Sequence, residues 1–397
     1  QKVNAEGGAC PRCIFKDECY VNRARGAAAL SHIVIINHAL LFSDLASDHA
    51  VLSDYSHLII DEAHNLEKVA IQHMTIETGG WRMRSVLRKL YVRDGIEIGL
   101  LATLKWRSER SPMKQVWKDS LAGATRLAIE RVNETERAIE TYFETINAEA
   151  LNLAKDRSGY ASKLRYGEED VFSTALKAQI PDLMQRFIHL RDALGLLGET
   201  INDIPESWLA DRDEFLNTIT ATLESCKMIE ENLTILTEAR QDNTVFWAEA
   251  SQNNPLSCAL IGAPLNVADR LYEDLFSQMR TVILTSATMA VGSKFNYMVN
   301  RLGLRKIEHP RLKVFRIGSP FDYQNQALVC VPSSFPSPKA DIFQASISEL
   351  IQGLVVAARR STLVLFTSYS MLDRTFSDLE SSLTQLGIPI MAQGISG

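Results

Sequence analysis

The stretch HLIIDEAHNLEKVA, residues 57–70, constrains the fold of this chain more than any other. An apolar run ends in two acids, and a helix-like pattern starts directly after them. Strand, acidic turn and helix in this order are typical of an α/β domain, in which ligands bind at the carboxyl ends of parallel strands. The alternative is an acidic cap on a helix N-terminus, which the helix dipole favours.

The acidic turn suits nucleotide chemistry. Mg²⁺ prefers oxygen ligands, and one carboxylate together with substrate phosphates can hold it, a role that fits Asp61. The neighbouring Glu62 can orient or deprotonate an attacking water, so both acids are candidate catalytic residues. His64 is placed to respond to the terminal phosphate. We therefore predict that this turn binds Mg²⁺ together with the phosphates of a nucleotide.

The rest of the chain separates into α/β and helical parts. Strand-like runs vanish between about 75 and 240, where apolar residues recur at three- and four-residue spacing. The expected elements are strands at 32–36, 57–60, 243–250, 256–265, 280–288 and 326–332, a hairpin turn at 251–255, helices at 65–74, 120–155 and 346–359, a loop at 156–170, and a strand running into a helix at 361–372. This order predicts an α/β domain split by a helical insertion and followed by a second α/β unit.

Length and charge set further bounds. The chain has 397 residues, enough for two or three domains, and its net charge is −6. No apolar run approaches the roughly 20 residues that span a bilayer, and no secretory signal opens the sequence. We expect a cytoplasmic protein that does not contact a membrane. Because the chain starts with Gln1 rather than Met and stops after MAQGISG, we expect it to be a piece of a longer protein.

Charge is unevenly distributed along the predicted helical block. Between Trp81 and Lys118 there are ten Lys/Arg and three Asp/Glu, whereas Leu196–Asp242 holds eleven acids and three bases. Lys and Arg neutralise phosphates and bases stack on aromatic rings, so the basic stretch is a candidate for single-stranded DNA binding. The candidate DNA contacts are Arg82, Arg84, Arg88 and Arg107. The alternative is a solvated helix face, and the interleaved tryptophans are more often core anchors.

Three of the six cysteines are clustered as C-x₂-C-x₅-C, at Cys10, Cys13 and Cys19. In a reducing compartment such a cluster favours a metal over disulfides. Iron–sulfur clusters are generally held by four cysteines, which leaves one ligand unaccounted for. The alternative is a zinc site completed by a histidine such as His32 or His38.

The ordered set of motifs resembles the iron–sulfur superfamily 2 DNA helicases of the DinG/XPD type, most of all the bacterial DinG-like branch. The motifs are CPRCIFKDECY, IINHALLFSDL, LIIDEAHNLEKVA, VILTSATM, GSPFDY and LVLFTSYSML. The resemblance implies a RecA-like motor domain interrupted by an iron–sulfur domain and a helical arch, then the start of a second RecA-like domain. It implies an iron–sulfur part at 1–28, motor domain 1 at 29–75 and 241–315, the arch at 76–240, and motor domain 2 at 316–397.

The resemblance also implies roles for single residues. Asp61 and Glu62 match the Walker B acids, with Asp61 on Mg²⁺, and His64 completes that box. Ser286 and Thr288 match the SAT motif, which couples nucleotide state to DNA grip, although an isolated Ser or Thr here could simply cap a helix. The remaining implied residues are Ser368 and Tyr369 as DNA-backbone contacts, for which a turn without function is the alternative, and Cys10, Cys13 and Cys19 as ligands of a four-iron four-sulfur (4Fe–4S) cluster.

The implied activity is ATP-dependent 5′→3′ translocation on single-stranded DNA with unwinding of forked duplexes, by a monomer. The sequence departs from the family at its ends, since it contains no G-x-x-x-x-G-K-S/T motif and no Gly-Lys dipeptide. We expect the phosphate-binding loop and the fourth cluster ligand upstream of Gln1 and the arginine motifs beyond Gly397, so that this piece alone is inactive. The rival hypotheses are a non-catalytic DNA-binding scaffold and a helicase fused to an upstream nuclease.

Overall fold

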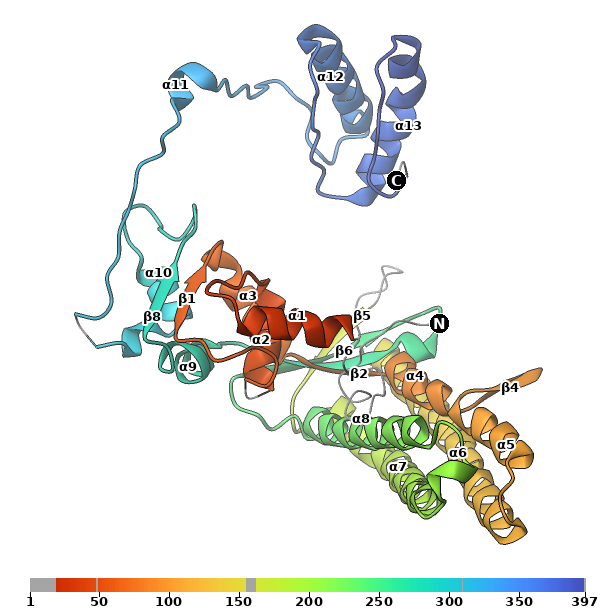
Figure 1. Ribbon diagram of the computed structural model, residues 1–397. Helices are drawn as coiled ribbons and strands as arrows, with labels where there is room; N and C mark the ends of the chain where they lie inside the picture. Colours follow the sequence, from red (N-terminus) through yellow and green to blue (C-terminus); the bar gives the residue numbers. More distant parts are fainter. Residues whose placement is uncertain (1–18, 48, 155–161, 309, 396–397) are drawn as a thin grey trace. The chain divides into compact units, whose positions relative to one another are not determined.

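The computed structural model describes residues 19–397 apart from 48, 155–161, 309 and 396–397 (Figure 1). The chain divides into two compact units, Gln1–Val314 and Phe315–Gly397, and each is described by itself. Cys10 and Cys13 of the predicted cluster lie outside the described residues, as does the start of the loop expected at 156–170.

A two-stranded parallel sheet joins distant parts of the sequence. Strand β1 (His57–Ile60) pairs with β8 (Thr281–Leu284), so that His57 lies opposite Thr281 and Ile60 opposite Leu284. Because the strands are parallel, their carboxyl ends meet at one edge. Both strands were predicted, and β8 alternates between exposed and half-buried residues.

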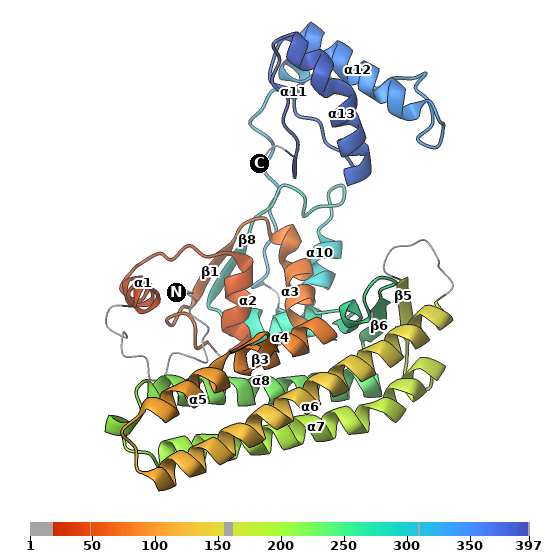
Figure 2. The ribbon, with the colours of Figure 1, turned by 90° about the vertical axis from the view of Figure 1, so that its right-hand side faces the viewer.

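Short helices lie beside this pair, and all of them except α1 supply its core (Figures 1 and 2). They are α1 (Tyr20–Ala29), α2 (His38–Ala46), the 3₁₀ turn η2 (Ala63–Asn65), α3 (Leu66–Met74), α9 (Ala268–Leu271), the π-helical turn η5 (Tyr272–Phe276), α10 (Asn296–Arg301) and η6 (Leu304–Lys306). Leu41 and Phe42 of α2 and Leu66 and Ala70 of α3 are buried in one cluster with Ile60. Helix α1 buries no side chain.

A four-stranded antiparallel sheet follows, in the order β2-β7-β6-β5. Its strands are β2 (Ile76–Gly79), β5 (Ser162–Tyr166), β6 (Thr244–Ala250) and β7 (Ala259–Pro264). In β6 the residues Phe246, Ala248 and Ala250 are buried and alternate with more exposed ones, the period expected of a strand that covers a core. The turn η4 (Pro255–Ser257) lies between β6 and β7, which confirms the predicted hairpin.

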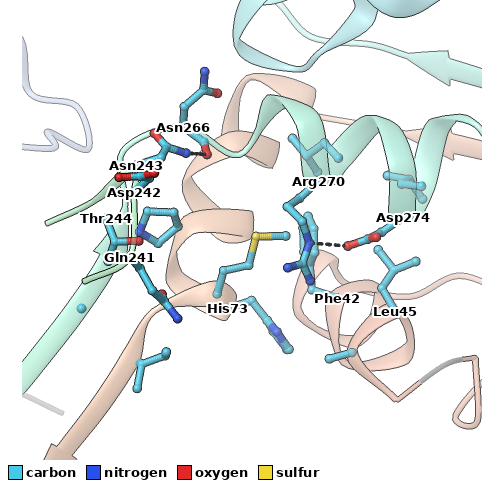
Figure 3. Close-up of a pocket in the computed structure, with 17 residues that line it drawn as sticks. Phe42, Leu45, His73, Gln241, Asp242, Asn243, Thr244, Asn266, Arg270 and Asp274 are labelled. Carbon is cyan, nitrogen blue, oxygen red and sulfur yellow. Dashed lines mark hydrogen bonds and ion pairs between the residues drawn. The ribbon is translucent and has the colours of Figure 1, made fainter. Parts of the chain in front are cut away.

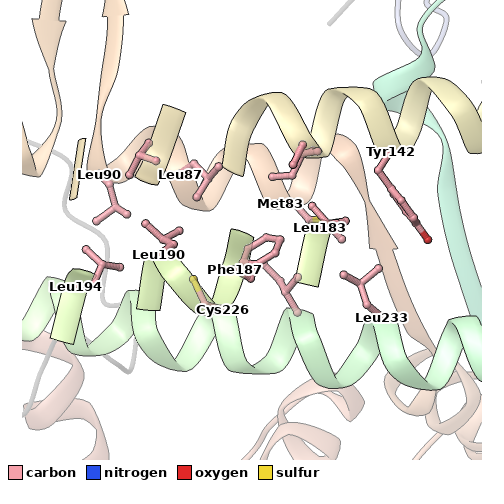
Figure 4. Packing of buried hydrophobic residues seen from close by; sticks show 14 of the residues in the cluster. Met83, Leu87, Leu90, Tyr142, Leu183, Phe187, Leu190, Leu194, Cys226 and Leu233 are labelled. Carbon is pink, nitrogen blue, oxygen red and sulfur yellow. The ribbon is translucent and has the colours of Figure 1, made fainter. Parts of the chain in front are cut away.

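The long helices form a layered bundle beneath that sheet (Figure 2). They are α4 (Gly80–Leu90), α5 (Leu100–Arg110), α6 (Gln115–Leu153), α7 (Val171–Asn202) and α8 (Arg212–Glu238), with the turn η3 (Glu206–Trp208) between the last two. Helix α7 packs on both α6 and α8. Figure 4 shows side chains such as Met83, Tyr142, Phe187 and Leu233 meeting between these helices, as the predicted apolar spacing requires.

Short strands within 75–240 correct the expectation that this block lacks them. Strands β2 and β5 belong to the four-stranded sheet, and β3 (Val92–Asp94) forms a hairpin with β4 (Ile96–Ile98). Gly95 has a positive φ of 72° at the tip of that hairpin, a conformation that glycine adopts without steric cost. Three to five residues are too few for an alternation to stand out in the sequence.

The predicted strand at 32–36 is also wrong, because these residues are irregular and Ile35 is 93% exposed. A strand needs a neighbour to bond its backbone, and no strand of the described residues pairs with this segment. Its β-branched composition is therefore not enough to make it a strand.

The second unit is helical in its described residues, 315–395. It contains α11 (Tyr323–Gln326), α12 (Phe343–Ala358) and α13 (Tyr369–Gln385), and the helix expected at 346–359 is confirmed. The strands expected at 326–332 and in 361–368 are absent from this described part, where both segments are irregular and leave Leu328 and Leu363 exposed. Helices α12 and α13 meet through Ser348, whose hydroxyl donates to Asp378 Oδ2 at 2.8 Å.

Candidate functional site

The acidic turn sits where β1 ends. Ile60 is buried, and the chain turns sharply before Ala63 and Leu66, both fully buried, lead into α3. Between them Asp61 and Glu62 are exposed. Glu62 adopts the left-handed backbone conformation with φ 49° and ψ 41°, which few residues other than glycine, asparagine and aspartate adopt. The turn therefore presents two carboxylates at the carboxyl edge of the parallel pair.

The end of β8 is bonded to that turn. The parallel ladder continues past both strands, because Thr285 donates its N–H to Ile60 O at 2.8 Å and accepts one at its own carbonyl from Ala63 at 2.9 Å. The Thr285 hydroxyl donates to Asp61 Oδ1 at 2.7 Å. This hydrogen bond, followed by one from the Glu62 N–H, holds the pKa of Asp61 below its ordinary value, so the side chain is ionised at neutral pH.

His64 connects the turn to the next residue of the β8 segment. Its Nδ1 lies 2.8 Å from Ser286 Oγ and 3.1 Å from Glu62 Oε2. The Ser286 hydroxyl oxygen also accepts the Thr288 N–H at 3.2 Å. On the opposite side of the turn, His38 Nε2 lies 3.0 Å from the Asp61 carbonyl oxygen. The network thus joins α2, the acidic turn and the segment after β8.

The structure brings together most of the predicted catalytic and coupling residues. Asp61, Glu62, His64 and Ser286 lie in one network, although Ser286 lies more than 200 positions after the other three in sequence. Thr288 takes part through its backbone N–H rather than through its hydroxyl. The hydroxyl that donates to Asp61 is instead that of Thr285, a residue that the motifs did not single out. Its role depends on the pairing of β8 with β1, which places the first residue after β8 beside Asp61.

The four candidate DNA-binding arginines have different surroundings. Arg84 Nε lies 2.6 Å from Glu136, and Arg107 Nη2 lies 2.6 Å from Asp211, so both are ion-paired within the fold. Arg88 is exposed, and so is Arg82, which reaches the Glu77 carbonyl at 3.3 Å. The acidic stretch after residue 196 therefore supplies one partner, Asp211, to the basic stretch.

The tryptophans of the basic stretch also differ. Trp117 packs against the main core, as expected for an anchor. Trp81 and Trp106 are 48% and 51% exposed, so the interpretation as core anchors fails for these two. The Arg110 guanidinium lies over the Trp106 ring at 4.3 Å. Helix α5 thus carries a stacked Arg–Trp pair that is exposed to solvent.

Two further predicted sites lie elsewhere. Ser368 is the N-cap of α13 and accepts the Met371 N–H at 3.3 Å, while Tyr369 is 65% exposed. Cys19 precedes α1 as its N-cap residue and is a free thiol. Among the described residues, no group of three or more His, Cys, Asp or Glu side chains could hold a metal ion.

The later cysteines have different surroundings. Burial raises the pKa of both Cys226 and Cys258 to about 12, so these thiols are inert core residues. Cys330, by contrast, is an exposed free thiol.

A cavity of about 500 Å³ opens elsewhere in the first unit (Figure 3). Phe42 of α2 and His73 of α3 form one wall. Arg270 and Asp274 line another, where Arg270 Nε donates to Asp274 Oδ2 at 3.0 Å. None of the predicted catalytic residues lines it. The acidic turn is therefore an edge site and not the floor of this cavity.

Comparison with known proteins gives distant relatives over nearly the whole chain. The "3'-5' exonuclease DinG" of Bacillus subtilis (strain 168) is 25% identical over 390 residues, which are 95% of this chain and 40% of that protein. The "ATP-dependent DNA helicase YoaA" of Escherichia coli (strain K12) is 25% identical over 395 residues, covering 98% of this chain and 52% of that protein. The "ATP-dependent helicase DinG" of Mycobacterium tuberculosis (strain ATCC 25618 / H37Rv) is 28% identical over 390 residues, covering 96% and 49%. No family model matches the chain.

By these likenesses the chain is a distant homologue of bacterial DNA helicases, and that homology implies a RecA-like helicase fold for its α/β parts. More particularly, it is a partial-length DinG-like segment, which spans about half the length of the curated relatives it matches. Of the described helices, none has the length and apolar character to cross a membrane.

Proposed function

We propose that this chain is the central part of an ATP-dependent DNA helicase that moves 5′→3′ on single-stranded DNA and unwinds forked duplexes. One observation carries the proposal, namely the bonding of the acidic turn after β1 to Thr285 and Ser286 after β8. The two halves of this network come from segments that the long helices separate in sequence. The alternative, a DNA-binding scaffold without catalysis, predicts that the whole protein does not turn over ATP.

The donor set fits a magnesium ion. Asp61 is an exposed, ionised carboxylate at the carboxyl edge of a parallel pair, and Mg²⁺ is bound in many nucleotide sites by one or two carboxylates together with phosphates. Bound Mg²⁺ would neutralise charge on the transferred phosphoryl group. Thr285 orients Asp61, and Glu62 beside it orients the attacking water and takes its proton. His64 links Glu62 to Ser286 and so relays the nucleotide state toward the segment after β8.

The domain organisation that we propose keeps the predicted boundaries. Residues 29–75 and 241–315 form the first motor domain, 76–240 the helical arch, and 316–397 the start of the second motor domain. The long helices α4–α8 and the division of the chain after Val314 support this order. Single-stranded DNA contacts the arch at Arg82 and Arg88 in this proposal, with Arg84 and Arg107 in supporting positions, and the second motor domain at Ser368 and Tyr369.

We also propose that residues 1–28 carry a 4Fe–4S cluster with Cys10, Cys13 and Cys19 as ligands. Cys19 is a free, partly exposed thiol, which fits the role of a ligand. The test is iron and sulfide analysis of the whole protein after anaerobic purification. Loss of both in Cys13→Ser is the expected result, and zinc in place of iron would contradict it.

The helicase proposal is tested by ATP hydrolysis and unwinding in the whole protein. We expect ATP turnover that single-stranded DNA stimulates, and unwinding of a duplex with a 5′ tail but not of the same duplex with a 3′ tail. Absence of DNA-stimulated turnover would contradict the proposal, and unwinding from the 3′ tail would contradict its polarity.

A second candidate activity comes from the printed name of the Bacillus subtilis relative, a 3'-5' exonuclease. This chain covers 40% of that protein, so in this candidate the nuclease activity belongs to a domain elsewhere in the polypeptide. It predicts digestion of single-stranded DNA that needs a divalent metal but no ATP. Such digestion should be unchanged by Glu62→Gln, because the two activities would use different sites.

A further inference from the structure

The backbone of the acidic turn is held in an uncommon conformation. Glu62 has φ 49° and ψ 41°, and a residue with a Cβ stays in this region when its surroundings hold it there. The side chain of Glu62 projects from this backbone, so the conformation decides where the carboxylate lies. The groups that hold the turn are therefore as important for the carboxylate as its own rotamer.

Three hydrogen bonds from outside the turn hold its backbone. Two of them are backbone bonds to β8, from Thr285 to Ile60 and from Ala63 to Thr285. The third is the hydrogen bond between His38 Nε2 and the Asp61 carbonyl oxygen, at 3.0 Å. That carbonyl belongs to the same planar peptide as the Glu62 N–H. An imidazole that holds the carbonyl therefore restricts rotation of the peptide that sets φ of Glu62.

The position of His38 is itself well determined. Asn37 caps α2 by accepting the Leu40 N–H at 2.8 Å, which makes His38 the first residue of the helix. Leu41 and Phe42, each 2% exposed, anchor the same helix in the core. Because the imidazole is not part of that core, its removal leaves the anchors of α2 in place.

We propose that His38 is a positioning residue for the acidic turn, with its Nε2–H holding the peptide between Asp61 and Glu62 so that the Glu62 carboxylate faces the reacting water. This inference rests on the proposed ATPase function for its effect on turnover. It predicts that loss of the imidazole lowers the rate of the chemical step and leaves nucleotide binding nearly unchanged.

The experiment compares His38→Ala, His38→Gln and His73→Ala. Gln keeps an N–H donor, and His73 is an exposed histidine bonded to Ser43 rather than to the turn. In the whole protein we expect kcat of His38→Ala to fall about 10- to 100-fold, the loss that a small misplacement of a catalytic group causes. Affinity for a fluorescent ATP analogue should change by less than about threefold. His38→Gln should recover part of kcat, and His73→Ala should match the wild type.

Hydrogen exchange of the turn gives a readout that needs no ATP. Peptides spanning residues 58–66 should exchange faster in His38→Ala than in the wild type or in His73→Ala. Unchanged exchange, unchanged kcat, or equal losses of kcat and nucleotide affinity would each overturn the inference. A wild-type protein without ATPase activity would instead contradict the proposed function, while the exchange measurement still decides whether His38 holds the turn.

Discussion

Asp61 is held at two of its atoms by side chains from different parts of the chain. The Thr285 hydroxyl bonds its carboxylate, and the His38 ring bonds its carbonyl oxygen. Loss of a residue that orients a metal ligand in this way typically lowers metal affinity or activity by about 10- to 100-fold. The chemistry proposed for the acidic turn therefore depends on Thr285 and His38 as well as on the two acids.

Replacing Thr285 tests this dependence. We predict that Thr285→Val, which keeps the shape but loses the hydroxyl, raises the Mg²⁺ concentration needed for half-maximal ATP turnover by about tenfold or more. Thr285→Ser keeps the hydroxyl and is the matched control. The measurement is a magnesium titration of ATPase activity in the whole protein. Equal magnesium dependence in Thr285→Val and the wild type would show that the bond does not orient a metal ligand.

At the scale of elements, the arginines on the helices of the basic stretch fall into two groups, those that are ion-paired and those that are exposed. Arg84 on α4 is bonded to Glu136 on α6, and Arg107 on α5 to Asp211. Partly exposed pairs of this kind contribute about 1 kcal/mol or less to stability. Arg82 and Arg88 on α4 are exposed. The structure thus separates cations that serve the fold from those that can serve a partner.

This division predicts different results for two double variants. Arg82→Ala with Arg88→Ala should weaken binding of single-stranded DNA and reduce the log–log salt slope by roughly 0.7 for each phosphate that the protein no longer neutralises. Arg84→Ala with Arg107→Ala should lower the melting temperature slightly and change the slope less. Fluorescence anisotropy with an oligonucleotide across a salt series measures both. If the slopes of the two double variants are equal, the exposed pair has no special part in DNA binding.

The loop between α2 and β1 is organised by one buried carboxylate. Burial raises the pKa of Asp44, but hydrogen bonds from two backbone N–H groups, His49 and Tyr55 lower it by more, so the pKa in the folded protein lies below its ordinary value. A lowered pKa contributes stability that is present above the unfolded value and is lost as the pH falls through the folded value. The carboxylate therefore stabilises the loop at neutral pH.

We predict that Asp44→Asn lowers the free energy of unfolding by about 1–3 kcal/mol at pH 7, because the bonds to Asp44 lose their ionic character. The difference from the wild type should shrink as the pH falls below about 4. Urea unfolding at a series of pH values measures it. A difference that is constant with pH would contradict an ionised Asp44 in the folded protein.

The sequence predicted the elements that local pattern determines and missed those that depend on a neighbour. The apolar spacing of α6 and the run before Asp61 were sufficient for a helix and a strand. The β-branched run at 32–36 failed because a strand also needs a partner strand. Thr285 was missed for a related reason, since its role comes from the register that places it beside Asp61, and one sequence does not show that register.

At the scale of the whole molecule, one small parallel pair unites the proposed catalytic machinery. Strands β1 and β8 lie on either side of the long helices and the four-stranded sheet in sequence, yet they pair in register. The network at their carboxyl ends joins the two halves of the first unit at the acidic turn. The central claim is therefore that this edge is where ATP is hydrolysed.

Glu62→Gln in the whole protein tests that claim most directly. The amide cannot take the proton of the attacking water, so we predict that DNA-stimulated ATP turnover falls by about 10²- to 10⁴-fold while ATP affinity is kept. Glu77→Gln, the same change at an exposed position on β2, is the control and should turn over ATP at the wild-type rate. Wild-type turnover in Glu62→Gln would contradict the assignment of this edge as the hydrolytic site.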